Sequence, residues 1–205
     1  MVLSLAACGS KADNKTTDTD AGSSVTSVSE NETSETEVPE TITLTNRNGA
    51  GETVEVEFPY NPKRLAVMDL GAMDILDNIG YGDRIVGVSK GSSIDYLQGY
   101  VNDDSLLNLG NVKEADMEAV MESDPDVIFI GGRMSAIYEE LVKIAPVYMV
   151  YTDTEKGVVE STEMNAKNIA ALFGAEDKVD ALVNDYNDRI DALKTFAEGK
   201  TAIVG

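Results

Sequence analysis

The stretch 124–133, with the sequence DPDVIFIGGR, constrains the fold more than any other part of the chain. Pro125 has no backbone N–H and disfavours the α conformation at the residue before it, so a helix cannot continue through this point. Residues 127–130 are apolar and rich in β-branched side chains, which predicts a strand buried on both faces of a parallel sheet. A Gly-Gly pair then allows a tight turn, and Arg133 follows the strand directly.

Apolar runs and helical patterns alternate along the rest of the body. Further strands are expected at 64–69, 84–89, 106–109 and 146–151, and helices at 71–79, 114–123, 135–144, with Ser135 as its cap, and 159–173. Residues 41–45 and 53–58 alternate apolar with polar and flank a glycine-containing loop, which predicts a β-hairpin covering one edge. The alternation as a whole predicts an α/β fold, a Rossmann-like lobe with a parallel sheet.

Ligands of open α/β sheets bind just outside the carboxyl ends of the strands. Arg133 is expected there, where its guanidinium presents a planar fork of donors to an anion, although a solvated loop arginine is the plainer interpretation. Glycines in the same places let backbone approach a ligand closely. Tyr96 and Tyr100 are expected to pack, with the rim of a site as the alternative. The candidate ligand contacts are Arg133, Lys90, Gly132, Asn111 and Leu70.

Composition excludes several classes of function. The formal net charge of −21 argues against nucleic acid or an anionic membrane surface as a direct partner. The chain has no histidine and a single cysteine, so neither the commonest metal ligand nor an internal disulfide is available. An anionic ligand would therefore depend on individually placed Arg and Lys side chains.

The amino end has the features of a processed and tethered protein. Residues 5–8, LAAC, resemble a bacterial lipobox, in which Cys8 becomes the lipidated first residue; a chance match in an apolar run is the alternative. Residues 1–8 would then be the remnant of a signal whose earlier part lies outside this sequence. Residues 9–40 are rich in Ser, Thr, Asp and Glu and are expected to form a disordered acidic tether.

The carboxyl end predicts a long helix followed by a new strand. Apolar residues recur at spacings of three and four residues over 176–197, which predicts an amphipathic helix. Residues 200–205 have the apolar character of a buried strand. We expect residues 41–174 to form an N-terminal lobe, residues 175–199 to form an inter-lobe helix, and a second α/β lobe to begin at 200–205.

The order of motifs resembles that of the iron-siderophore-binding lipoproteins of bacterial ABC importers. The matching segments are NPKRLAVMDL at 61–70, IVGVSK at 85–90, LGNVKEAD at 109–116 and DPDVIFI at 124–130. The ferric-catecholate subgroup, which includes binding proteins for enterobactin and petrobactin, is the most similar. The chain departs from the family pattern at Ala115, often proline, and at Asn111, often glycine, which affects the floor of the cleft at most.

The resemblance implies a class III periplasmic binding protein, with two Rossmann-like lobes joined by a rigid helix and the ligand between them. It implies binding and delivery of a ferric siderophore without catalysis and without a resident cofactor. Arg133 matches one of the family's cargo-binding arginines and Lys90 a cleft-facing lysine, whereas the remaining donors belong to the second lobe.

The implied partners are the permease subunits and, through the lipid on Cys8, the extracellular face of the cytoplasmic membrane, in a Gram-positive bacterium. A monomer is expected. Acidic residues on helix faces are candidates for docking to the permease: Glu118, Glu122, Glu139 and Glu140.

Three alternatives remain open. The first is a protein of this fold that binds corrinoid, haem or a metal ion, which the lack of histidine weakens. The second is a Rossmann-type enzyme, but neither G-x-G-x-x-G after the first strand nor G-x-x-x-x-G-K-[ST] occurs. The third is a structural or adhesin-like lipoprotein without a small ligand.

Overall fold

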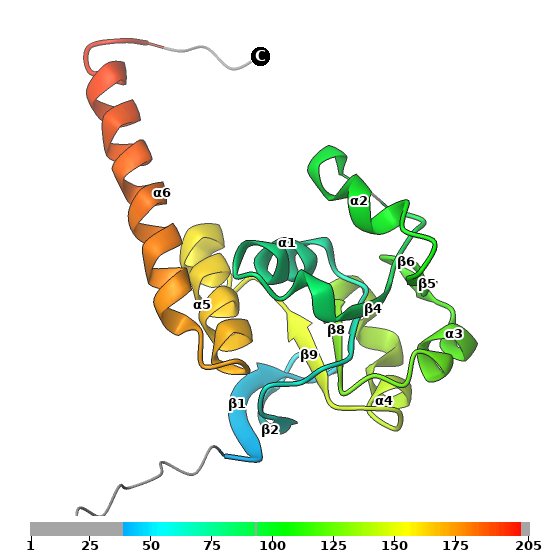
Figure 1. Cartoon of the computed structure of the whole chain (residues 1–205). Helices are drawn as coiled ribbons and strands as arrows, with labels where there is room; N and C mark the ends of the chain where they lie inside the picture. Colours follow the sequence, from blue (N-terminus) through cyan, green and yellow to red (C-terminus); the bar gives the residue numbers. More distant parts are fainter. Residues whose placement is uncertain (1–38, 93, 202–205) are drawn as a thin grey trace, which may run out of the picture. The chain divides into compact units, whose positions relative to one another are not determined.

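The alternating strands and helices form a five-stranded parallel sheet with helices on both faces (Figure 1). The computed structural model describes residues 39–92 and 94–201. The strand order is β5-β4-β3-β8-β9, and every neighbouring pair is parallel. The strands are β3 (Leu65–Val67), β4 (Ile85–Val88), β5 (Leu107–Asn108), β8 (Val127–Gly131) and β9 (Val147–Val150).

The strand order reverses direction between β3 and β8. From β3 the chain builds outward through β4 to β5, and from β8 it builds outward the other way to β9. The first crossover includes α1 (Leu70–Asn78), and the last consists of the 3₁₀ segment η3 (Gly132–Ile137) and α4 (Tyr138–Leu141). Such a reversal leaves a crevice at the carboxyl ends of the two central strands, because their connections leave toward opposite faces.

Side chains of β8 alternate between two buried layers. Val127 and Phe129 pack in one apolar cluster, Ile128 and Ile130 pack in the other, and all four are fully buried. The prediction of a strand buried on both faces is therefore confirmed, because only helices on both sides of a sheet can bury successive side chains.

Helices of unequal length cover the two faces. One face carries α1 with α5 (Gly157–Ala171) and the start of α6 (Glu176–Ala197), and the other carries α3 (Met117–Glu122), η3 and α4. Three shorter helical segments connect the central strands: η1 (Gly82–Arg84), η2 (Asp95–Leu97) and α2 (Gln98–Val101).

The predicted hairpin is present and lies against one edge of the sheet. Its strands are β1 (Thr41–Arg47) and β2 (Thr53–Pro59), paired antiparallel. The side-chain amide of Asn46 donates to the Val147 carbonyl at 3.1 Å, so the hairpin is tied to the edge strand β9. Covering that edge satisfies backbone groups that would otherwise be open to pairing with another chain.

A network of polar contacts fixes the amino ends of β3 and β8. The Asp126 carboxylate accepts from the backbone N–H groups of Lys63, at 2.6 Å, and Arg64, at 2.9 Å. The Arg64 guanidinium in turn donates to the carbonyls of Ser123, at 2.6 Å, and Asp124, at 2.7 Å. These contacts hold the two strands in register from the end opposite the crevice.

Two predicted helices were partly wrong. The helix expected over 114–123 begins only at Met117, because Glu114–Ala115 (β7) pairs with Gly110–Asn111 (β6) as a small hairpin and Asp116 caps the helix. The helix expected over 135–144 is instead η3 followed by the short α4. Ser135 lies inside η3, because the chain turns into this segment directly from Gly131 at the end of β8.

The described part of α6 packs on the body mainly through its first turns. Val179 is 1% exposed, whereas Leu193 and Phe196 are 61% and 70% exposed. In residues 39–92 and 94–201, no helix combines the length and the apolar character needed to cross a bilayer. Cys8, the predicted tether 9–40 up to residue 38, and most of the strand predicted at 200–205 lie outside the described residues.

Replacing Phe129 by alanine should lower the free energy of unfolding by about 3–5 kcal/mol, because a fully buried ring at the centre of the sheet leaves a cavity. The matched control in this 205-residue chain is Phe196→Ala, which removes the same ring from an exposed position on α6, where the ring contacts the Lys200 ammonium, and should cost less than about 1 kcal/mol. Urea denaturation followed by circular dichroism measures both. Equal losses in the two variants would contradict the assignment of Phe129 to the core.

Candidate functional site

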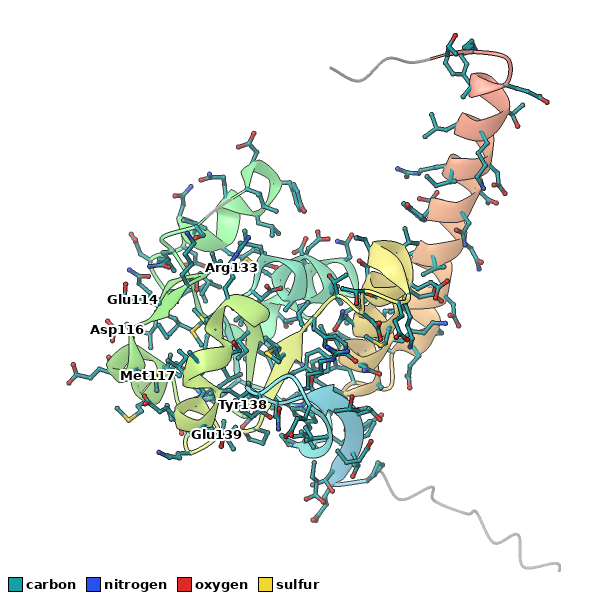
Figure 2. All side chains as sticks on the ribbon, turned by 180° about the vertical axis from the view of Figure 1, so that it is seen from behind. Glu114, Asp116, Met117, Arg133, Tyr138 and Glu139 are labelled. Atoms are coloured by element: carbon teal, nitrogen blue, oxygen red, sulfur yellow. The ribbon has the colours of Figure 1, made fainter. Side chains whose placement is uncertain are left out.

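The carboxyl ends of β3 and β8 bring together residues that are far apart in the sequence. Asp69 and Leu70 follow β3, and Gly132 and Arg133 follow β8. Arg133 lies at the start of η3 (Figure 2), with Tyr138 and Glu139 at the far end of the same helical segment. Its side chain is exposed, and within the described ranges no carboxylate lies within 4.0 Å of it. The guanidinium is therefore available to a ligand.

Asp69 is the acidic neighbour of this arginine. One carboxylate oxygen, Oδ1, accepts from the backbone N–H of Ala72 at 3.0 Å and so caps α1. The other, Oδ2, faces β8, since a Cβ atom on Gly131 would stand 2.5 Å from it. Burial raises the pKa of Asp69 above its usual range, and the amide hydrogen bonds and the charge of Arg133 offset this only in part.

Lys90 follows β4 and has one of its donors occupied. Its ammonium group donates to the Asp103 carbonyl at 2.6 Å, and its side chain is partly buried. The loop that carries it is tied to the β6–β7 hairpin by a 2.9 Å hydrogen bond from Gly91 N–H to the Gly110 carbonyl. An ammonium has three donors, so Lys90 keeps two that a ligand can use.

The β6–β7 hairpin adds a cation that the sequence analysis did not single out. The Asn111 side chain accepts from the backbone N–H groups of Lys113, at 2.9 Å, and Glu114, at 3.1 Å, and so builds the turn. Lys113 is exposed on this turn. A helix was predicted from residue 114, so the strand β7 was not expected there. The signal that favoured a turn was Gly110 followed by Asn111.

The other predicted residues have different environments. Leu70 is partly buried and packs against the apolar cluster under α1, and Gly132 faces open space. Tyr100 donates from its hydroxyl to Asp77 at 2.5 Å, in keeping with the expectation that it packs, whereas Tyr96 is 69% exposed. The sequence analysis also missed Asp69, although an Asp three residues before Ala72 at the start of a helix is a typical cap.

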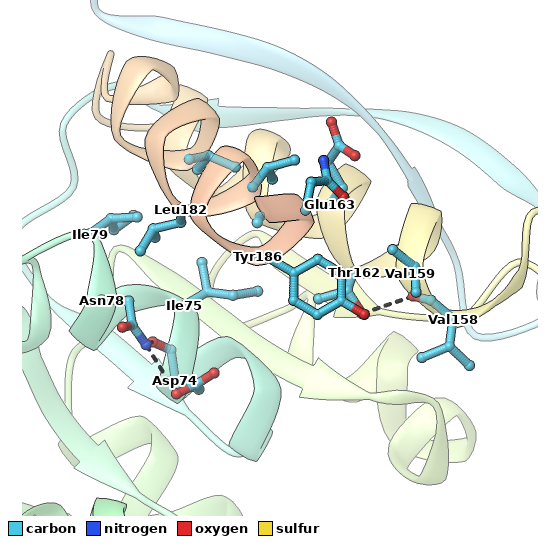
Figure 3. Close-up of a pocket in the computed structure, with 14 residues that line it drawn as sticks. Asp74, Ile75, Asn78, Ile79, Val158, Val159, Thr162, Glu163, Leu182 and Tyr186 are labelled. Atoms are coloured by element: carbon cyan, nitrogen blue, oxygen red, sulfur yellow. Dashed lines mark hydrogen bonds between the residues drawn. The ribbon is translucent and has the colours of Figure 1, made fainter. Parts of the chain in front are cut away.

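A separate apolar groove of about 380 Å³ lies between α1, α5 and α6 (Figure 3). Leu182 and Tyr186 lie on the side of α6 that faces this groove, 43% and 45% exposed. Its charged lining consists of Asp74 and Glu163 and includes no Lys or Arg. Arg133, Lys90 and Lys113 form what we call the cationic edge of the sheet. An anionic ligand is therefore favoured at this edge and disfavoured in the groove.

Among the residues that the structure describes, no three or more His, Cys, Asp or Glu side chains are placed to hold a metal ion. Arg133, Lys90 and Lys113 offer charged donors for hydrogen bonds at this edge, and Asp69 is the opposing charge.

Gly131→Ala should lower the free energy of unfolding by about 1–3 kcal/mol, because its methyl group would collide with the Asp69 carboxylate that caps α1. Gly132→Ala is the matched control and should be nearly neutral, since nothing lies within 4 Å of the position of its Cβ. Thermal and urea unfolding of both variants test this. Similar stability of the two variants would show that Asp69 is not held against Gly131.

Asp69→Asn should raise the free energy of unfolding at neutral pH. The pKa of Asp69 is raised in the folded state, so ionisation weakens the fold, and this loss is relieved as the pH falls through the raised value. The asparagine amide oxygen still accepts from Ala72 N–H. In urea denaturation, the excess free energy of unfolding of the variant over the wild type should shrink from about pH 7 toward about pH 4. A variant less stable than the wild type at neutral pH would contradict the expectation.

The chain is similar to known binding proteins in sequence. It is 40% identical over 138 residues to the petrobactin-binding protein YclQ of Bacillus subtilis, a match that covers 67% of this chain and 43% of YclQ. It is 22% identical over 138 residues to the ferric-anguibactin-binding protein FatB of Vibrio anguillarum, which covers 66% of this chain and 42% of FatB. The chain thus spans less than half the length of these relatives.

Solved structures show the same similarity. The crystal structure of YclQ from Bacillus subtilis superposes with a TM-score of 0.72 at 35% identity, covering 78% of this chain and 54% of that one. The catecholate-siderophore binding protein VctP from Vibrio cholerae superposes with a TM-score of 0.65 at 30% identity, covering 77% and 55%. The predicted Rossmann-like lobe of a class III binding protein is thereby confirmed.

The model of one protein family, described as periplasmic binding protein, matches residues 65–204. This match extends from the first core strand through the long helix α6 and covers more than half of the chain. The chain therefore belongs to the periplasmic binding protein family.

Proposed function

We propose that this protein is the solute-binding component of an ABC importer and that its cargo is a ferric siderophore, with an anionic ferric catecholate as the favoured class. The observation that carries the proposal is Arg133 at the reversal of strand order, without an ion-pair partner among residues 39–92 and 94–201, in a chain similar to petrobactin- and catecholate-siderophore-binding proteins. The protein captures its cargo outside the cell membrane and delivers it to the permease.

The chemistry that this function needs is recognition without bond making. A ferric ion held by three catecholate groups carries several net negative charges, and an acidic protein can hold it only with donors placed at the contact. Arg133 supplies a planar fork, and Lys90 supplies a compact charge from the neighbouring loop. Lys113 extends the cationic edge along the β6–β7 hairpin, and Gly132 lets the cargo approach the backbone closely.

A second α/β lobe, following α6, is part of the proposal. The chain spans about half of the structures it superposes on, and α6 carries apolar side chains beyond the part that packs on the body. The groove between α1, α5 and α6 is apolar and suits the packing of further polypeptide. The second lobe would supply the donors that complete the site from the opposite side.

Membrane attachment and docking complete the proposal. The lipid on Cys8 anchors a monomer to the extracellular face of the cytoplasmic membrane of a Gram-positive bacterium, and residues 9–40 serve as the tether. Exposed acids on α3 and on α4, at the far end of the η3–α4 segment from Arg133, offer contacts to basic permease residues: Glu118, Glu122, Glu139 and Glu140.

Ferric catecholate should quench the tyrosine fluorescence of the protein saturably, and Arg133→Gln should weaken the affinity about 10- to 100-fold, because charge-assisted hydrogen bonds to the anion are lost. The matched control is Arg189→Gln on α6, where an exposed arginine pairs with Asp185 at 2.9 Å; it should bind as the wild type does. A fluorescence titration measures all three proteins.

A ferric hydroxamate serves as the competing cargo in the same titration. Quenching by the hydroxamate alone, or equal affinity of the two variants for the catecholate, would contradict the assignment of cargo and of Arg133. If neither complex quenches, the siderophore function itself is wrong, and titrations with corrinoid, haem and free metal ions become the next measurement.

A further inference from the structure

The amino terminus of α1 lies where the strand order reverses, and an anion would ordinarily bind at such a place. Unpaired N–H groups and the helix dipole make a helix amino terminus favourable for negative charge, and in α/β folds it often lies at the carboxyl edge of the sheet. In this protein that position is already filled from within, because the Asp69 carboxylate accepts from Ala72 N–H and lies against Gly71.

The second oxygen of the same carboxylate is directed across to β8. It occupies the space that a Cβ of Gly131 would need, two residues before Arg133. The charge of Arg133 acts on Asp69, yet the two side chains do not come within 4.0 Å in an ion pair. Asp69 thus places a negative charge close to the arginine without occupying its donors.

Capping of the helix does not by itself require this charge. A neutral asparagine or serine caps a helix as well as aspartate does. Burial works against the ionised form of Asp69, so the charged carboxylate is the less favourable cap at neutral pH. Because Asp69 lies near Arg133, which is proposed to contact the cargo, its charge can act on the cargo as well as on the helix.

We propose that Asp69 is a specificity-determining residue of the cargo site, where its fixed negative charge lowers the affinity for anions and does so more strongly the higher their charge. This inference rests on the function proposed above. A small anion that contacts Arg133 is repelled by Asp69, and the same carboxylate blocks the amino terminus of α1. A large anionic complex offsets this repulsion because it contacts several cations at once. The residue therefore imposes a cost that rises with the charge of the ligand, and a highly charged cargo offsets this cost by contacting further cations such as Lys90.

The test compares two ferric complexes of known charge. Three catecholate groups leave a ferric complex with three negative charges, and three hydroxamate groups leave it neutral. In fluorescence titrations at low salt, Asp69→Asn should tighten binding of the tris-catecholate complex about fivefold or more and change binding of the trihydroxamate complex less than about twofold. The gain should shrink in about 0.5 M salt.

The matched control is Asp177→Asn, which removes the same charge from an exposed first turn of α6 and should leave both affinities unchanged. Circular dichroism melting confirms that each variant is folded. Weaker binding of the tris-catecholate by a folded Asp69→Asn variant, equal changes for both complexes, or the same gain in Asp177→Asn would each overturn the proposal.

A second measurement needs no cargo. The carboxyl carbon resonance of Asp69 reports its titration by NMR, and Arg133→Gln should raise the pKa of Asp69, because a neighbouring positive charge is lost. Identical titrations in the two proteins would overturn the proposed coupling. If the wild type binds neither complex, the proposed function fails, and this titration still decides whether Asp69 and Arg133 act on one another.

Discussion

The candidate site depends on the parallel pairing of β3 with β8. Leu65 lies opposite Val127, and the contacts of Arg64 and Asp126 hold the two strands together at their amino ends. The same register places Val67, the last residue of β3, opposite Phe129, and β8 continues to Gly131, so the residues that follow β3 run alongside the end of β8. This pairing brings Asp69 and Arg133 near enough for their charges to interact, although the two side chains form no ion pair. A shift of one residue in this register would reverse the faces of β8 and separate the two side chains.

The surroundings of Arg133 differ from those of the arginines that hold the fold together. Arg64 donates to two carbonyls, Arg84 to the Asn61 side chain and the Pro62 carbonyl, and Arg47 lies over the ring of Tyr151. Each of these guanidinium groups is used to hold the fold. Arg133 is exposed and has no such partner within the described ranges. In a chain with a net charge of −21, this arginine at a strand reversal is the observation on which the proposal of an anionic ligand rests.

The cationic edge and the apolar groove serve different kinds of contact. The edge carries the charged donors of Arg133, Lys90 and Lys113, which suit an anionic small molecule. The groove has apolar walls from α1, α5 and α6 and acidic residues at its rim, which suits polypeptide. Their separation agrees with the proposal that one surface receives cargo and the other packs against a second lobe. The apolar groove is therefore a different place from the edge where the proposed cargo binds.

The sequence alone determined the strands, the two-faced burial of β8, the hairpin at the edge and the place of Arg133 after a strand, because these follow from local periodicity, proline and glycine. It did not determine the β6–β7 hairpin, the 3₁₀ course of η3 or the position of Lys113, where side-chain caps and close glycine contacts override helical propensity. Nor did it single out Asp69, which the sequence alone presents as an ordinary helix cap. Only the tertiary structure placed that carboxylate beside Gly131 and Arg133, because the pairing of β3 with β8 joins segments that are distant in the chain and that no local pattern connects.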